Sequence, residues 1–165
     1  FYEMLTNRVF PATCWLRNME ELNYIEEPDM FHDVFGHIPL LVNPAYAQFM
    51  QRFGTLAMKW INDADAIAIL ARVYWYTIEF GLLNENGNNK IFGAGIISSI
   101  GETAHVYSNA SQKTPFDVHQ MLATPYRIDT LQPLFFVMES FEQLCSAIPQ
   151  IDAELSNIVS EQYTH

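Results

Sequence analysis

Two histidines, His32 and His37, lie five residues apart in the segment FHDVFGHIP. On a straight α-helix, five residues turn by about 140° beyond a full turn, so the two imidazole rings would point in different directions. The rings converge if the helix ends between them, and Gly36 and Pro39 are residues of the kind that end helices. We therefore expect His32 on a last helical turn and His37 just beyond it, where both could bind one metal ion. The other interpretation of this spacing is two unrelated histidines.

A single carboxylate, Glu79, lies near the end of an apolar run over residues 64–80. A helix that is apolar on all sides is normally buried, and a buried carboxylate is costly unless it is paired or bound to a metal. Arg72 is the only cation of this run, and seven residues of helix separate it from Glu79 by about 10.5 Å, too far for an ion pair. Glu79 therefore needs a partner from elsewhere in the chain, either a cation or a shared metal ion.

Together, His32, His37 and Glu79 form a possible metal-binding set. Two neutral imidazoles and one carboxylate are the facial triad that holds non-haem Fe(II) and leaves positions open for oxygen and a cosubstrate. The same residue types in a tetrahedral arrangement suit a catalytic zinc with a bound water. Tyr74 and Trp75, within about one turn of Glu79, favour an aromatic-lined pocket and an oxidant that acts on an aromatic substrate. For any single ring, packing in the core is the alternative explanation.

The elements that must position these residues are mostly helices. Apolar spacing, an N-cap at Asp63 and proline or glycine at the segment ends define them. The predicted helices cover residues 1–10, 44–56, 64–80, 115–122, 134–148 and 150–161, with a turn at 84–89, a tight bend at 93–95 and short strands or extended segments at 90–92 and 126–130. We expect a mainly α fold in which residues 1–165 belong to a single catalytic domain of packed helices with a few short strands.

The composition limits the classes of function. The chain has 165 residues, a net charge of −11 and a pI near 4.6, so nucleic acid and anionic membranes would repel it. No apolar run approaches the ~20 residues of a membrane span. The two cysteines, Cys14 and Cys145, are too few for a disulfide scaffold, which favours a reducing cytoplasm. We expect a monomer, with a dimer through the acidic last helices as the alternative, and we expect further residues upstream of Phe1 because no initiator methionine is present.

The chain contains, in order and over almost its whole length, the segments EEPDMFHDVFGHIPLL, ARVYWYTIEFGL, GAGIISSIGE and YRIDTLQPLFFVMESFE. Together they resemble the pterin-dependent aromatic amino acid hydroxylases, most of all the short bacterial members that act on phenylalanine. The resemblance implies the hydroxylase fold, an Fe(II) bound by His32, His37 and Glu79, and conversion of L-phenylalanine to L-tyrosine with oxygen and a tetrahydropterin. The alternatives are a zinc-dependent hydrolase with the same triad and a degenerate relative that only binds an aromatic amino acid.

The resemblance also assigns residues to the amino acid substrate. It implies that Arg17 holds the substrate carboxylate with two parallel hydrogen bonds, and that Glu102 orients Arg17. A surface charge and a solvated carboxylate are the structural alternatives for these two residues. Trp75 and Ser98 are implied to lie beside the substrate, and Gly95 to let the backbone pass close to it.

Two positions bear on the choice of substrate. Ile128 is apolar where tyrosine hydroxylases have an aspartate, and Ile25 replaces a threonine of the animal phenylalanine hydroxylases. Phenylalanine is therefore favoured, with tryptophan as a minor substrate. On the pterin side, Phe1 is implied to stack on the ring and Asp33 to reach it through water. The other residues implied to line the pterin are Ala71 and Tyr74.

Overall fold

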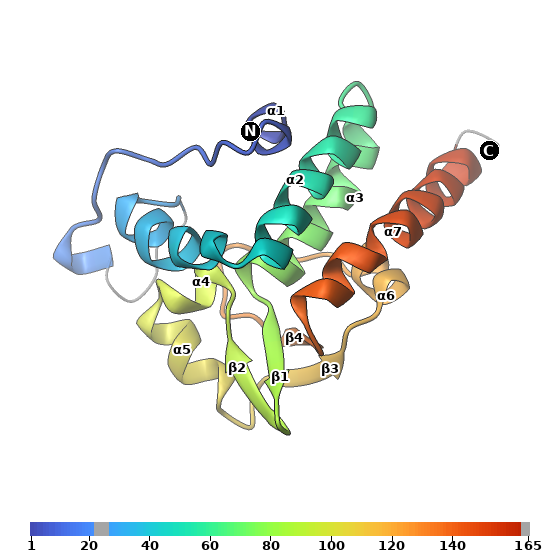
Figure 1. Cartoon of the computed structure of the whole chain (residues 1–165). Helices are drawn as coiled ribbons and strands as arrows, with labels where there is room; N and C mark the ends of the chain where they lie inside the picture. The colour runs from blue at the N-terminus through green and yellow to red at the C-terminus, as the bar shows by residue number, and fades with distance from the viewer. Residues whose placement is uncertain (22–26, 163–165) are drawn as a thin grey trace.

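The structure is a computed structural model that describes residues 1–21 and 27–162 (Figure 1). Most of these residues are helical, which confirms the mainly α prediction. The α-helices are α1 (Tyr2–Thr6), α2 (Pro44–Lys59), α3 (Ala64–Tyr74), α4 (Ala94–Ile97), α5 (Ile100–Val106), α6 (Val118–Ala123) and α7 (Phe141–Gln162). The 3-10 helices are η1 (Met19–Glu21) and η3 (Ile38–Val42), and the π-helices are η2 (His32–His37) and η4 (Trp75–Glu79). Within the described ranges, no helix has the length and apolar character needed to cross a membrane.

The long helices hold most of the hydrophobic core. Helix α7 packs against α2 and α3, and α1 packs against α2 (Figure 1). Tyr46, Phe49 and Phe53 on α2 and Leu70 on α3 are fully buried. Helix α2 begins where it was predicted, because the Asn43 side chain accepts hydrogen bonds from the first free amides of the helix. The structure extends it to Lys59, three residues beyond the predicted end.

A four-stranded sheet lies beside α4 and α5, in the order β2-β1-β4-β3 (Figure 1). Its strands are β1 (Leu82–Glu85), β2 (Asn88–Ile91), β3 (Gln112–Pro115) and β4 (Leu134–Met138). Strands β1 and β2 form an antiparallel hairpin. Asn86 and Gly87 have φ of 53° and 81° at its tip, which confirms the predicted turn there. Strand β4 pairs in parallel with both β1 and β3.

The helix predicted over residues 134–148 is wrong in its first part. Residues 134–138, with the sequence LFFVM, form the interior strand β4, in which Phe135, Phe136 and Met138 are fully buried. A short continuous apolar run is compatible with either a buried strand or a buried helix. Pairing with strands on both sides decides between them here, and that pairing is not visible in the local sequence.

The predicted division of the last helix at Pro149 is also wrong, because α7 runs unbroken through this residue. A proline inside a helix removes the amide that would bond to the carbonyl four residues earlier, here Cys145. Arg52 of α2 replaces that missing donor: its Nη1 lies 3.2 Å from the Cys145 carbonyl oxygen. Packing against α2 therefore satisfies the group that the proline leaves without a partner.

Three shorter predictions need correction. Helix α1 is half the predicted length and is followed by Arg8 with φ 59°, a left-handed conformation that no helix continues through. Pro115 ends strand β3 instead of opening a helix, and α6 is capped by Asp117, whose Oδ1 accepts from the Gln120 amide at 2.7 Å. The glycine-rich bend at 93–95 leads directly into the short helix α4, which begins at Ala94.

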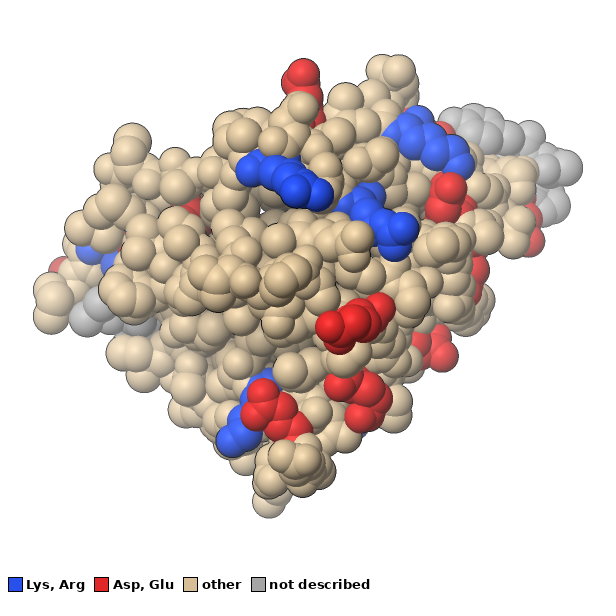
Figure 2. Space-filling model, in the orientation of Figure 1, with Lys and Arg blue, Asp and Glu red and all other residues tan. Residues whose placement is uncertain are grey.

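The charged side chains do not gather into one surface on the face shown in Figure 2. Acidic and basic groups form separate small clusters on a largely uncharged surface. Opposite charges also pair across helices, as Lys59 of α2 does with Asp152 of α7, at 2.7 Å. This face therefore offers no continuous basic surface of the kind that nucleic acids bind.

Candidate metal centre and adjoining cavities

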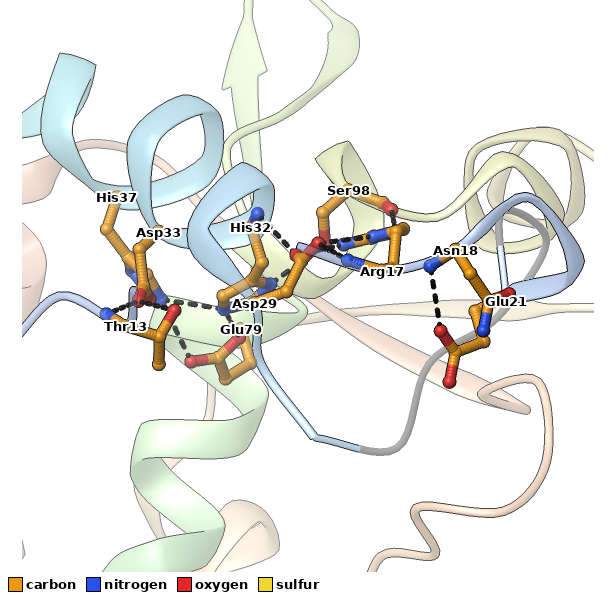
Figure 3. Close-up of polar contacts among 10 residues, drawn as sticks. All are labelled: Thr13, Arg17, Asn18, Glu21, Asp29, His32, Asp33, His37, Glu79 and Ser98. Carbon is orange, nitrogen blue, oxygen red and sulfur yellow. Dashed lines mark hydrogen bonds and ion pairs between the residues drawn. The ribbon is translucent and has the colours of Figure 1, made fainter. Parts of the chain in front are cut away.

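The two histidines lie on one π-helix. In η2 the Ile38 amide bonds to the Asp33 carbonyl, five residues back, so residues five apart lie nearly above one another. His32 Nε2 and His37 Nε2 are 3.0 Å apart (Figure 3). The prediction that the helix ends between the two histidines is therefore wrong: the helix widens instead, and this brings the rings together.

Glu79 is the last residue of the second π-helix. In η4 the Phe80 amide donates to the Trp75 carbonyl at 2.8 Å, again five residues back. Glu79 Oε2 lies 3.4 Å from His32 Nε2, and Glu79 Oε1 lies 3.3 Å from His37 Nε2. The two π-helices therefore bring their polar side chains together: His32 and His37 of η2 meet Glu79 of η4 (Figure 3).

Small residues let α4 sit against both π-helices. A Cβ on Gly36 of η2 would lie 2.6 Å from the Cβ of Ala94. A Cβ on Gly95 would lie 2.7 Å from the Phe80 ring, just after η4. Gly95 was predicted to let the backbone pass close to the substrate. In this structure the close approach that requires a glycine is to the ring of Phe80, the residue after Glu79.

The donor atoms fit a divalent metal ion. Three donors at about 2.1 Å from one ion are separated by about 3.0 Å in adjacent octahedral positions and by about 3.4 Å in a tetrahedron. The observed distances of 3.0, 3.3 and 3.4 Å span both arrangements. His32 and His37 are buried, and the Glu79 side chain is only 13% exposed. Three sets of lone pairs that converge in a buried place need a cation to stabilise them.

The electrostatics favour the metal-binding protonation states. Burial lowers the pKa of His32, against the opposing effect of the nearby Glu79 charge. Burial tends to raise the pKa of Glu79, but His37, His32 and a hydrogen bond from Tyr74 outweigh it, so this pKa lies below its ordinary value. A neutral His32 and an ionised Glu79 are the forms in which these residues bind metals.

The triad lines a cavity of about 420 Å³. Phe1, Asp33 and Tyr74, three of the residues implied to bind the pterin, line the same cavity, whereas Ala71 does not. Phe1 is 52% exposed, and its ring meets Tyr74 edge-on, with 5.4 Å between centroids. Asp33 accepts two hydrogen bonds on Oδ2, from the Thr13 amide at 2.7 Å and the Thr13 hydroxyl at 2.8 Å. Both bonds fall on one oxygen, so Oδ1 keeps its capacity to accept.

Arg17 is held by Asp29. Its Nε donates to Oδ2 of Asp29 at 2.9 Å and its Nη2 to Oδ1 at 2.7 Å, and the two side chains are 5% and 0% exposed. Nη1 donates to the Ser98 carbonyl, and the guanidinium lies over the Phe31 ring at 5.1 Å. Burial tends to raise the pKa of Asp29, but the bonds from Arg17 and from the His32 amide hold it well below its usual range. A guanidinium has five N–H groups, so one on each terminal nitrogen remains for a ligand.

A second cavity, of about 430 Å³, opens beside Arg17. It is largely apolar, and its other lining residues are Phe31, Ile97, Ser98, Ile100, Thr103 and Ala104. Ser98 links it to the metal centre, because its hydroxyl lies 2.8 Å from His32 Nδ1. The triad thus has a cavity on the side of Phe1 and, behind His32, a second cavity with Arg17 in its wall.

Comparison with known proteins decides the family. The family model described as biopterin-dependent aromatic amino acid hydroxylase matches residues 1–165. This chain belongs to that family. The phenylalanine-4-hydroxylase of Ralstonia nicotianae is 49% identical to it over 148 residues, which are 89% of this chain and 47% of the relative. The chain spans about half the length of the curated relatives it matches.

Solved structures of this hydroxylase family match the fold. The Chromobacterium violaceum phenylalanine hydroxylase with bound Fe(III) matches 97% of this chain and 58% of its own, with TM-score 0.89 and 43% identity. The structure of that enzyme with iron(III) and 7,8-dihydrobiopterin matches 98% of this chain and 58% of its own, with TM-score 0.88 and 42% identity. The prediction of an aromatic amino acid hydroxylase-like fold is therefore confirmed.

Some residues assigned from the hydroxylase resemblance do not contact what was predicted. Glu102 does not orient Arg17: it is fully buried, and its Oε1 accepts from the Gln132 amide at 2.9 Å. Asp29 has that role instead. Ile128 is 47% exposed and lines neither cavity, and Ile25 lies outside the described residues.

Trp75 is fixed from several sides. Its ring stacks on Tyr126 with centroids 4.4 Å apart and lies 4.4 Å from the Phe80 ring at a tilt of 33°. Its Nε1 donates to Gln132 Oε1 at 3.0 Å. Neither Gln132 nor Asp29 was among the residues predicted from the sequence. For Asp29 a signal existed: its Oδ1 accepts from the amide of His32 at 2.9 Å, three residues on, which is N-cap spacing.

Proposed function

We propose that this protein is a monooxygenase that converts L-phenylalanine to L-tyrosine, with oxygen and a tetrahydropterin as co-reactants, at an Fe(II) bound by His32, His37 and Glu79. The observation that carries the proposal is the convergence of these three donors beside one cavity lined with aromatic rings and next to a second cavity that Arg17 lines. The first suits a planar pterin, and the second suits the carboxylate of an amino acid. One oxygen atom would enter the aromatic ring, and the other would leave on the pterin.

The relatives support both the metal and the co-reactant. The Chromobacterium violaceum enzyme has been solved with iron(III) and 7,8-dihydrobiopterin. The donor set here, two imidazoles and one carboxylate, is the set that binds non-haem Fe(II) with open positions. Iron in this site would supply the redox chemistry that activates oxygen, with the pterin as the source of electrons.

The residues of this chain would bind and orient the reactants. Arg17 would hold the substrate carboxylate with the two N–H groups that Asp29 and Ser98 leave free. Phe1 would cover one face of the pterin, and Oδ1 of Asp33 would accept a hydrogen bond from it directly or through water. Trp75, on the same π-helix as Glu79, would present apolar surface to a phenyl ring, which favours phenylalanine over tyrosine.

We also propose a domain organisation, a class of partners, an oligomeric state and a compartment for the enzyme. Residues 1–165 would be part of one catalytic domain, whose partners are small molecules and not nucleic acids or membranes. We propose a monomer in the cytoplasm. Cys14 and Cys145 are both free thiols, one exposed and one buried, which suits a reducing compartment.

The test is amino acid consumption by the purified protein with Fe(II), oxygen, a tetrahydropterin and equal amounts of phenylalanine, tyrosine and tryptophan. We expect tyrosine to accumulate at the expense of phenylalanine, and only when both pterin and oxygen are present. The variants His32→Ala and Glu79→Ala should stay folded, lose bound iron and form no product. Lys90→Ala, a change at an exposed position on strand β2, is the matched control and should behave as the wild type.

Two results would contradict the proposal. Turnover that continues without oxygen or pterin would indicate a hydrolase or another reaction class. Full activity in either triad variant would show that the reaction does not depend on these ligands.

A further inference from the structure

Gln132 is a buried glutamine whose polar groups are all bonded, with 1% of its surface exposed. Its amide donates to Glu102 Oε1 at 2.9 Å, and its carbonyl accepts from His105 Nε2 at 3.0 Å. Its side-chain oxygen accepts from Trp75 Nε1 at 3.0 Å. Its side-chain nitrogen donates to the carbonyl oxygens of Arg127 and Thr130, at 2.8 and 2.9 Å.

These bonds join three parts of the chain that are distant in sequence. The backbone of Gln132 is fixed to α5 through Glu102 and His105. Its side chain then joins η4, at Trp75, to the loop over residues 127–130. That loop includes Ile128 and directly follows Tyr126, the ring stacked on Trp75.

The chemistry of this position requires a glutamine. The position needs one acceptor for the indole N–H and two donors for the two carbonyl oxygens, at the end of a side chain whose backbone is bonded to α5. Only the side-chain amides of Asn and Gln offer an acceptor and two donors together, and Asn is one methylene shorter. A glutamate has no donor when it is ionised, and a methionine of similar length has no strong polar group.

We infer that Gln132 is a positioning residue that affects substrate specificity, because it fixes the indole of Trp75 and the loop over residues 127–130 as one rigid wall beside η4, the π-helix that carries Glu79. This inference rests on the proposed function and adds a residue to it. Trp75 and Glu79 are the first and last residues of η4, so a shift of the Trp75 ring would act directly on the helix that positions a residue of the triad. A small misplacement of bound reactants lowers the rate of the chemical step.

Removal of the side-chain amide of Gln132 should release both the indole of Trp75 and the loop over residues 127–130. In Gln132→Met the backbone bonds to Glu102 and His105 remain, whereas the indole N–H and two carbonyl oxygens lose their partner. We expect kcat/KM for phenylalanine to fall by about tenfold or more. The KM for the pterin should stay within about twofold, because the residues that line the pterin side are in the other cavity. The ratio of kcat/KM for phenylalanine to that for tryptophan should fall, because Trp75 and the loop are no longer held in one position.

A second measurement does not depend on activity. The chain has three tryptophans, and the indole N–H signal that disappears in Trp75→Phe identifies Trp75 in nitrogen-15 NMR spectra of the metal-free protein. In Gln132→Met this N–H should exchange with solvent at least about tenfold faster than in the wild type. Gln132→Glu, which keeps an acceptor for the indole, should retain most of the protection. Gln112→Met, at an exposed position on β3, is the matched control and should change neither the kinetics nor the exchange.

The outcomes separate this inference from the proposed function. If the wild type forms no tyrosine, the proposed function fails, and the exchange of the indole N–H still judges the role of Gln132 in holding Trp75. If the wild type is active and Gln132→Met keeps its kcat/KM and its substrate preference, the inference is overturned. Unchanged protection of the indole in Gln132→Met would overturn it as well. Should Gln132→Met fail to fold, Trp75→Phe removes the same bond from the other side and should show the same narrowing of preference.

Discussion

The hydroxyl oxygen of Ser98 lies 2.8 Å from Nδ1 of His32. The other ring nitrogen of His32 faces His37 and Glu79, at 3.0 and 3.4 Å. Ser98 therefore holds the imidazole from behind and fixes which nitrogen points to the triad. The same residue accepts a hydrogen bond from Arg17 through its carbonyl oxygen, so one short segment orients both a metal ligand and the cation of the neighbouring cavity (Figure 3).

We predict that Ser98→Ala weakens Fe(II) binding by about 10- to 100-fold, because partners of this kind orient metal-bound histidines and raise their basicity. Anaerobic titration of the metal-free protein with Fe(II) measures the effect. Ser99→Ala is the matched control: its hydroxyl caps α5, accepting from the Glu102 amide at 3.2 Å. That variant should lose about 1 kcal/mol of stability and keep its metal affinity. Equal metal affinity in Ser98→Ala and the wild type would show that His32 needs no such support.

We predict that Asp29→Asn lowers the free energy of unfolding by about 3 kcal/mol, since it leaves the buried charge of Arg17 without its partner. Urea denaturation at neutral pH measures the loss. The control is Asp129→Asn at the exposed Arg127–Asp129 pair, whose side chains are 70% and 52% exposed, where no measurable change is expected. If the two variants are equally stable, Asp29 does not hold Arg17 in the way described.

We predict that the cost of Arg52→Met depends on Pro149. In the wild type this change removes the donor to the Cys145 carbonyl and should cost about 1 kcal/mol. In a Pro149→Ala background the new amide can donate to the same carbonyl, so the cost should largely disappear. Lys59→Met is the control, because its partner Asp152 is unaffected by residue 149 and the two changes should be additive. Additive effects for Arg52→Met would mean that Arg52 does not replace the missing amide.

The parts of the fold that were predicted from sequence have local causes. The Asp63 and Asn43 caps and the apolar spacing define the starts of α3 and α2, and Asn86 and Gly87 define the hairpin turn. Residue type and predicted burial single out the three residues of the triad as a possible metal-binding set, and the family resemblance assigns them to iron. Their geometry does not follow from the sequence, because a π-helix over His32–His37 has the composition of an ordinary helix end and depends on how closely α4 can approach Gly36.

The wrong predictions concern segments whose structure depends on residues distant in sequence. Strand β4 is a strand because two other strands pair with it, and Pro149 stays within α7 because Arg52, far away in sequence, replaces its amide. The same applies to the site. Glu102 was assigned to Arg17, but the sequence gives no measure of which acid reaches it. Gln132 has no clear local signal because its partners Trp75, Glu102 and His105 are distant in sequence.

Stability should depend on pH through Glu102. This residue is fully buried, one of its oxygens accepts from the Gln132 amide, and its Oε2 has no partner among the described residues. Burial raises the pKa of Glu102 from 4.5 to about 7, although the bond from Gln132 opposes the shift. Between these two values the folded state keeps a proton that the unfolded state has lost. The contribution to stability is therefore complete below pH 4.5 and falls as the pH rises towards 7, by at most about 1.4 kcal/mol per pH unit.

We predict that Glu102→Gln removes this dependence, because an amide does not titrate. The difference in unfolding free energy between the variant and the wild type should shift in favour of the variant by about 3 kcal/mol between pH 4.5 and pH 8, measured by urea denaturation at several pH values. Every other titrating group is common to both proteins, so the difference isolates Glu102. Glu85→Gln, at an exposed position on β1, is the control and should give a difference that does not vary with pH. If the difference in unfolding free energy between Glu102→Gln and the wild type is also independent of pH, Glu102 titrates like an exposed carboxylate. Its burial beside Gln132 then has no electrostatic cost.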